Sequence, residues 1–173
     1  LGKIKLQNLL MINIGVVGCG DWASKIINEI NLNNKFNLNS IVCRKRKEII
    51  PGIKVFNSIE KMVDANITDS IYVAADPKLN LEIVKLLKNL KTPLILEKPI
   101  CDSFKNIKIL KEIIEKNKLL VFPNITNYFS ETFVILKKLT DENYKDISEV
   151  IIYEGGVGPF RKNIHPVWDW GFH

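Results

Sequence analysis

Apolar runs and amphipathic segments alternate along this chain, and that alternation restricts the possible folds more than any other feature. Ile12–Val17 is an apolar run typical of a strand, and Ser70–Ala75 is an uninterrupted apolar run of the kind that is buried on both faces of a sheet. Between them, Ile26, Ile27 and Ile30 recur on one side of a helix. Repeated strand–helix–strand units imply right-handed crossovers, so the sequence predicts an α/β fold with a doubly wound parallel sheet.

The same pattern continues to residue 124 and then changes. We expect further strands at 37–43, around Val55, at 94–96 and at 119–122, and helices at 21–30, at 58–64, from Pro77 and after Ser103. A helix at 131–139 follows, and we expect the β-branched stretch at 147–155 to form the first strand of a different sheet. We therefore expect residues 11–124 to form the parallel α/β domain and residues 125–173 to begin an incomplete, truncated α+β domain. Residues 1–10 would be an upstream extension or an alternative start.

The composition is that of an ordinary globular protein. Of 173 residues, 46% are hydrophobic and 25% are charged, which indicates neither disorder nor a membrane bundle. Lys and Arg exceed Asp and Glu by 25 to 19, but the lysines are spread along predicted helix faces, which favours solvated faces over a nucleic-acid footprint. Three cysteines without Cys-x-x-Cys spacing argue against a disulfide framework and a zinc site, and favour a reducing cytoplasm.

The N-terminal segment allows a second interpretation. Lys3 and Lys5, followed by an apolar run up to Cys19, resemble a signal peptide that ends at a lipoprotein-type cysteine. The run is short and is interrupted by Asn13, and it also suits a buried first strand that leads into a tight turn. We therefore favour the strand.

A glycine-rich turn, Gly18-x-Gly20-x-x-Ala23, directly follows the first predicted strand and opens the first predicted helix. The first glycine permits a tight turn, the second lets the backbone approach a pyrophosphate, and the small third residue lets helix and strand pack closely. Backbone N–H groups at the start of the helix, which carries Asp21 and Trp22, would face the phosphates. In the first βαβ unit, this turn predicts a dinucleotide site.

The end of the second predicted strand indicates which dinucleotide binds. Folds that bind NAD often place Asp or Glu there to accept a hydrogen bond from the ribose 2′-hydroxyl. This chain has Cys43-Arg44-Lys45-Arg46 instead. Because Arg44 can stack on adenine or bind a 2′-phosphate, and no carboxylate stands there to repel that phosphate, we expect NADP(H) in preference to NAD(H). A solvated basic loop is the alternative.

Two further motifs suggest a catalytic site. Lys98, within Glu97-Lys98-Pro99, lies just past the carboxyl end of a predicted parallel strand, where open α/β sheets bind their ligands. There its ammonium group can donate hydrogen bonds to a sugar hydroxyl. Asp169 and His173 are four residues apart, so on a helix they would share one face and reach the same hydroxyl.

Taken together, these motifs resemble the Gfo/Idh/MocA family of oxidoreductases. The matching segments are Gly18-Cys19-Gly20-Asp21-Trp22-Ala23, Tyr72-Val73-Ala74-Ala75-Asp76-Pro77, Leu96-Glu97-Lys98-Pro99 and Asp169-x-Gly171-x-His173, in an order and spacing that match over 11–173. The resemblance implies a catalytic set of Lys98, Asp169 and His173, with His173 as the proton-transfer group. It also implies that Ala75, Asp76, Pro77, Glu97 and Lys98 lie along the cofactor, and that the full-length protein is a homo-oligomer.

The chain departs from the family pattern after the strand that ends at Ala75. Relatives often carry Thr-Pro there and a histidine a few residues later, whereas this chain has Asp76-Pro77 and Asn80. We expect Asp76 to lie near the nicotinamide ribose, where its carboxylate would accept a hydrogen bond or repel a phosphate.

The resemblance implies an NAD(P)-dependent oxidoreductase that transfers hydride between nicotinamide and a sugar, sugar derivative or polyol. From composition and residue spacing we also expect no metal, no nucleic-acid partner and no membrane. Two alternatives remain open: a non-catalytic nucleotide- or ligand-binding module, and an inactive fragment of such an enzyme. We expect this chain to bind NADP(H) weakly and to lack measurable turnover.

Overall fold

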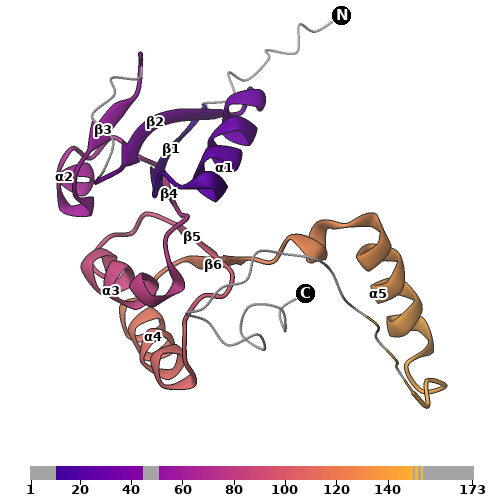
Figure 1. Ribbon diagram of the computed structural model, residues 1–173. Helices are drawn as coiled ribbons and strands as arrows, with labels where there is room; N and C mark the ends of the chain where they lie inside the picture. The colour runs from indigo at the N-terminus through magenta and orange to yellow at the C-terminus, as the bar shows by residue number, and fades with distance from the viewer. Residues whose placement is uncertain (1–10, 45–50, 150, 152, 154–173) are drawn as a thin grey trace, which may run out of the picture. The chain divides into compact units, whose positions relative to one another are not determined.

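The structure, a computed structural model, describes residues 11–44, 51–149, 151 and 153. The chain forms two compact units, Leu1–Pro123 and Asn124–His173. Figure 1 shows the order of helices and strands in both units.

One six-stranded sheet organises the first unit. Its strand order is β3-β2-β1-β4-β5-β6, and the pairings among β1 to β5 are all parallel. The winding therefore reverses between β1 and β4, as in the Rossmann order of a doubly wound fold. This confirms the parallel α/β architecture expected from the sequence. The strands are β1 Ile12–Val17, β2 Phe36–Val42, β3 Lys54–Phe56, β4 Ser70–Val73, β5 Leu94–Glu97 and β6 Val121–Asn124.

In the described residues four helices connect these strands, and polar side chains begin three of them. The hydroxyls of Ser58 and Ser103 and the carboxylate of Asp76 each accept a hydrogen bond from a backbone N–H in the first turn of their helix. Such caps satisfy amide groups that have no partner within a helix. The helices are α1 Asp21–Leu32, α2 Ile59–Asp64, α3 Pro77–Leu87 and α4 Phe104–Asn117.

Apolar clusters cover both faces of the sheet. Val16 and Val17 belong to different clusters, because successive side chains of a strand point to opposite faces. On one face Ala23 and Ile30 pack α1 against the sheet. On the other face α2, α3 and α4 pack through buried residues such as Met62, Val84 and Leu110, and α3 and α4 lie side by side (Figure 1).

Gly15, in the middle of β1, permits a close approach of neighbouring side chains. The register between β1 and β2 shifts there, from Ile14 opposite Leu38 to Gly15 opposite Ser40. A Cβ atom at Gly15 would lie 2.8 Å from Ser40 Oγ, 2.8 Å from Thr68 Cγ2 and 3.0 Å from Met62 Sδ. These contacts leave no room for a methyl group in the strand.

The second unit begins with a 3₁₀ helix, η1 Thr126–Phe129, and the α-helix α5 Glu131–Asn143. Ser130 caps α5 by accepting a hydrogen bond from Phe133 N. The helix predicted at 131–139 is therefore present and one turn longer. The strand expected at 147–155 is wrong for residues 147–149, 151 and 153, which adopt no strand conformation. Its β-branched composition is insufficient, because a strand forms only where a partner supplies hydrogen bonds.

We expect Gly15→Ala to lower the free energy of unfolding by about 2 kcal/mol, because the added methyl overpacks a filled site. Urea denaturation would measure the change. Gly20→Ala is the matched control: its φ of −82° is ordinary, and nothing lies within 4 Å of the added Cβ. The free energy of unfolding of the control should fall by less than about 1 kcal/mol, because alanine is a poorer helix cap than glycine. Equal losses in both variants would contradict the packing argument.

Candidate functional site

The predicted site residues that the structure describes gather at the carboxyl edge of the sheet. Val17 lies opposite Val42 on one side and Val73 on the other, and Val73 lies opposite Leu96. The residues that follow these four positions therefore form one row across β2, β1, β4 and β5. The row is Cys43, Gly18, Ala74 and Glu97. It crosses the point where the winding of the sheet reverses, which is where open α/β sheets bind ligands.

Gly18 is required by the geometry of its turn. Its φ is +124°, and a Cβ atom there would lie 2.4 Å from the carbonyl oxygen of Ala74. Its N–H donates to the carbonyl oxygen of Val42 at 3.0 Å, while Ala74 N donates to the carbonyl oxygen of Val17 at 2.9 Å. The turn is thus joined to the ends of β2 and β4 at once, as the glycine motif predicts.

The amino end of α1 differs from the other α-helix starts in the described residues. Gly20 precedes α1 and offers no capping side chain, whereas Ser58, Asp76, Ser103 and Ser130 cap α2 to α5. The space around a Cβ at Gly20 is also open. Uncapped amide groups beside open space are the arrangement that binds a phosphate at a helix N-terminus.

The other motif residues of α1 divide between packing and exposure. Ala23 is fully buried against the sheet, as expected for the small third position of the motif. Asp21 and Trp22 are exposed in the first turn, and the Lys25 ammonium group lies 5.5 Å from the centre of the Trp22 ring. The turn therefore presents a charged and aromatic rim to solvent.

Asp76 follows β4 and acts as a helix cap. Its carboxylate Oδ1 accepts a hydrogen bond from Lys78 N at 3.0 Å, and Pro77 is the first residue of α3. Ala75, directly before, is partly buried. The capping bond explains why an aspartate stands at this position, and the contact of Asp76 with a ribose stays a prediction.

Glu97 ends β5 as a buried carboxylate with a buried partner. Tyr72, from the neighbouring strand β4, donates its hydroxyl hydrogen bond to Glu97 Oε1. The sequence interpretation took Tyr72 only as part of a matching segment and missed this role. A phenol within an otherwise apolar strand was the available signal, because a buried tyrosine hydroxyl usually has a partner.

Lys98 follows at the edge itself and is partly buried, and the Lys98–Pro99 peptide bond is cis. The segment after it is held by Asn80, a fully buried residue of α3 whose side-chain Nδ2 donates to the carbonyl oxygen of Ile100 at 3.3 Å. Asn80 thus connects α3 to the loop that carries Lys98. Its polar side chain on the buried face of α3 was the sequence signal for such a role.

Cys19 and Cys43 form a disulfide, with their Cα atoms 5.5 Å apart. The sequence argument against disulfides is therefore wrong for this pair. The two residues are 24 positions apart, and only the β1–β2 register brings them together. Arg44, directly after Cys43, is exposed. Lys45, Asp169 and His173 lie outside the described residues.

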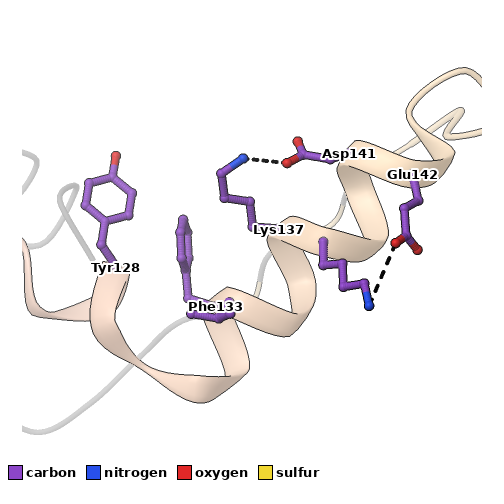
Figure 2. A pocket seen from close by; sticks show the side chains of 7 residues that line it. Tyr128, Phe133, Lys137, Asp141 and Glu142 are labelled. Atoms are coloured by element: carbon purple, nitrogen blue, oxygen red, sulfur yellow. Dashed lines mark hydrogen bonds and ion pairs between the residues drawn. The ribbon is translucent and has the colours of Figure 1, made fainter. Parts of the chain in front are cut away.

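Two of the hollows on the described surface are lined in part by residues named above. One is about 320 Å³, adjoins the row and is lined by Cys43, Val55, Phe56, Asn57 and Lys61. The other, about 340 Å³, belongs to η1 and α5 in the second unit (Figure 2). There the Tyr128 and Phe133 rings meet edge to face, 4.9 Å apart, beside two ion pairs formed within α5. Exposed pairs of this kind are solvated surface contacts, and no predicted site residue lines that hollow.

Across 11–44 and 51–149, His, Cys, Asp and Glu side chains form no group of three that would hold a metal ion. None of the helices in these ranges combines the length and the apolar content needed to cross a bilayer.

A family model described as an oxidoreductase family with an NAD-binding Rossmann fold, GFO_IDH_MocA, matches residues 12–125. No curated protein gives a significant match. Solved structures share the fold at low identity. Scyllo-inositol dehydrogenase from Lactobacillus casei, with bound NAD(H) and scyllo-inositol, has a TM-score of 0.68 and 19% identity over 78% of this chain and 42% of its own.

Two further structures show the same fold. D-galactose-1-dehydrogenase from Rhizobium etli has a TM-score of 0.67 and 20% identity over 78% of this chain and 44% of its own. A dehydrogenase from Chromobacterium violaceum has a TM-score of 0.68 and 16% identity over 76% of this chain and 41% of its own. The chain thus spans less than half the length of these three proteins.

We expect Tyr72→Phe to lower the free energy of unfolding by about 1–3 kcal/mol, because it removes a hydrogen-bond donor from the buried Glu97 carboxylate. Tyr128→Phe is the matched control, since Tyr128 is 55% exposed and keeps its ring contact with Phe133. The control should be unchanged in urea denaturation. A Tyr72→Phe variant as stable as the parent chain would show that the hydroxyl does not support Glu97.

Proposed function

We propose that this chain binds NADP(H) in preference to NAD(H). The chain belongs to the Gfo/Idh/MocA family of oxidoreductases, which has an NAD-binding Rossmann fold. We propose further that the whole protein transfers hydride between that cofactor and a sugar, a sugar derivative or a polyol. The observation that carries the proposal is the uncapped start of α1, which opens beside Gly20 where the sheet reverses its winding.

The described residues fit the pyrophosphate of a dinucleotide. Gly18 turns the chain away from the end of β1, and Gly20 leaves the space in front of the first helical amides open. These amides, together with the helix dipole, favour an anion at that position. Asp21 and Trp22 would form the rim of the phosphate site, and Ala23 keeps α1 close to the sheet.

The preference for NADP(H) rests on the end of β2. Arg44 is exposed there, directly beyond the paired residues, and it carries a permanent positive charge with a planar set of donors. A guanidinium group binds phosphate through two parallel hydrogen bonds. Lys45, which follows, would add a second positive charge. A 2′-phosphate is the group that distinguishes NADP(H), and it would be held here.

Lys98 is the proposed substrate-binding group of the described part. The Tyr72–Glu97 hydrogen bond and the Asn80–Ile100 hydrogen bond hold the chain on both sides of it. From this edge its ammonium group would donate to the reacting oxygen of the substrate and align it. A bound nicotinamide would supply or accept the hydride.

The proton would be handled by His173, whose ordinary pKa of about 6.5 suits exchange near neutral pH. Asp169 would orient the imidazole or bind a neighbouring hydroxyl. The neighbouring structures support a polyhydroxylated substrate, since their names include an inositol dehydrogenase and a galactose dehydrogenase. A whole protein that binds the cofactor but oxidises no inositol or aldose would instead be a non-catalytic binding module.

Gly20→Ala tests the phosphate site. We expect the variant to fold normally and to bind NADPH at least about tenfold more weakly, because the methyl group enters the space in front of the helix amides. Isothermal titration calorimetry of the 173-residue chain would measure the affinity. An unchanged dissociation constant would place the dinucleotide elsewhere and reject the proposal.

Arg44→Ala tests the choice of dinucleotide. We expect a loss of about tenfold or more in NADPH affinity, the effect of one charge-assisted hydrogen bond, and little change for NADH. Lys35→Ala also removes an exposed positive charge, just before β2 at the opposite edge of the sheet, and serves as the matched control. Equal losses for both dinucleotides would mean that Arg44 does not recognise the 2′-phosphate.

A further inference from the structure

The Cys19–Cys43 disulfide joins the two elements that would hold the adenosine half of a dinucleotide. Cys19 stands between the two glycines of the turn, and Cys43 directly follows β2. The backbone sets this proximity without the sulfur atoms, because Gly18 N donates to Val42 O at 3.0 Å and Cys43 N donates to Phe56 O at 2.9 Å. The two thiols of the reduced chain would therefore remain neighbours.

The bridge stands between two parts of the edge that a nucleotide would have to span. On one side is the glycine turn with the uncapped start of α1. On the other is the hollow of about 320 Å³ that Cys43 lines together with Phe56, Asn57 and others. A hollow of this volume is in the range of small-molecule sites. In dinucleotide folds the adenosine ribose lies between the glycine-rich turn and the end of the second strand.

The pair has one accessible member and one buried member. Cys19 is partly exposed, whereas Cys43 is 3% exposed. Cys101, the remaining cysteine of the chain, is buried among core residues. Its burial, together with the nearby Asp102 carboxylate, raises the pKa of the Cys101 thiol to about 11. Because the thiolate is the reactive form, Cys101 is a poor competitor for thiol exchange near neutral pH.

We propose that Cys19 and Cys43 are a redox-sensitive pair whose disulfide closes the adenosine end of the dinucleotide site, so that the oxidised chain binds the cofactor more weakly than the reduced chain. The proposal rests on the proposed cofactor function. The partly exposed Cys19 beside the buried Cys43 allows thiol–disulfide exchange to form and break the bond in place. A bond between the phosphate turn and the ribose-binding strand end would couple a redox signal to cofactor affinity.

The oxidant is a small-molecule disulfide such as glutathione disulfide. The Cys19 thiolate attacks one glutathione sulfur and releases the other glutathione as a thiolate, which leaves a mixed disulfide on Cys19. The Cys43 thiolate then attacks the Cys19 sulfur and releases the second glutathione. Two protein thiols lose two electrons, one glutathione disulfide gains them, and the two protons pass to the two glutathione thiolates. A dithiol reductant reverses both steps.

The test compares the same chain in two redox states. The 173-residue chain is reduced with a phosphine or oxidised with glutathione disulfide, freed of reagent, and titrated with NADH and with NADPH by calorimetry. Thiol titration should count three thiols before oxidation, the number of cysteines in the chain, and fewer by two afterwards. We expect the oxidised chain to bind at least about tenfold more weakly.

Cysteine variants test whether the difference in affinity between the redox states comes from Cys19 and Cys43. Cys43→Ser and Cys19→Ser should give the same dissociation constant before and after glutathione disulfide, whereas Cys101→Ala should keep the full difference. Circular dichroism checks that each variant is folded, and the two redox states of the parent chain give the answer even if a variant is not.

Three other outcomes would overturn different parts of the proposal. A thiol count that stays at three after oxidation would overturn the redox pair. Equal dinucleotide affinity in both redox states, with the disulfide formed, would show that the bond does not close the site. The proposed cofactor function would remain intact. A reduced chain that binds neither dinucleotide would reject the proposed function, and the closure of its site with it.

Discussion

The fold of the first unit depends on one close backbone contact, in which Gly18 passes over the carbonyl group of Ala74. No side chain fits there, because a Cβ would lie 2.4 Å from that oxygen. The contact lets the chain leave β1 between its two neighbours, with hydrogen bonds to the ends of β2 and β4 on either side. The sheet reverses its winding at this point, so the start of α1 and the loops after β4 and β5 share one edge.

Two further interactions extend that edge toward β5. The Tyr72 hydroxyl supports the buried Glu97 carboxylate, and Asn80 holds the chain just after Pro99. Burying a carboxylate or an amide is unfavourable unless hydrogen bonds compensate for the loss of water. These polar groups therefore lie in the core for a positional reason: they fix the segment that presents Lys98. The two ends of the edge, one proposed to hold phosphate and the other to hold substrate, are thus held by different kinds of interaction.

Most of the fold of the first unit follows from the sequence, because its strands and helices carry strong local signals. Apolar runs predicted β1 and β4, and Pro77, Ser58 and Ser103 predicted helix starts within a residue or two. Pairings between distant residues carry no such signal. The Tyr72–Glu97 hydrogen bond and the Cys19–Cys43 bridge depend on strand register, which a single sequence does not reveal. The strand expected at 147–155 failed in its described residues for a related reason, since β-branched composition does not supply a partner strand.

We propose that a dinucleotide binds across the row formed by Cys43, Gly18, Ala74 and Glu97. Titration of the reduced, isotope-labelled chain with NADPH, followed by backbone amide NMR, tests it most directly. We expect the largest chemical-shift changes at 18–23, with smaller ones at Arg44, at 74–76 and at 97–98. Residues 128–142, around the hollow on α5, should be unchanged. Shifts confined to α5, or spread evenly over exposed lysines, would contradict the account.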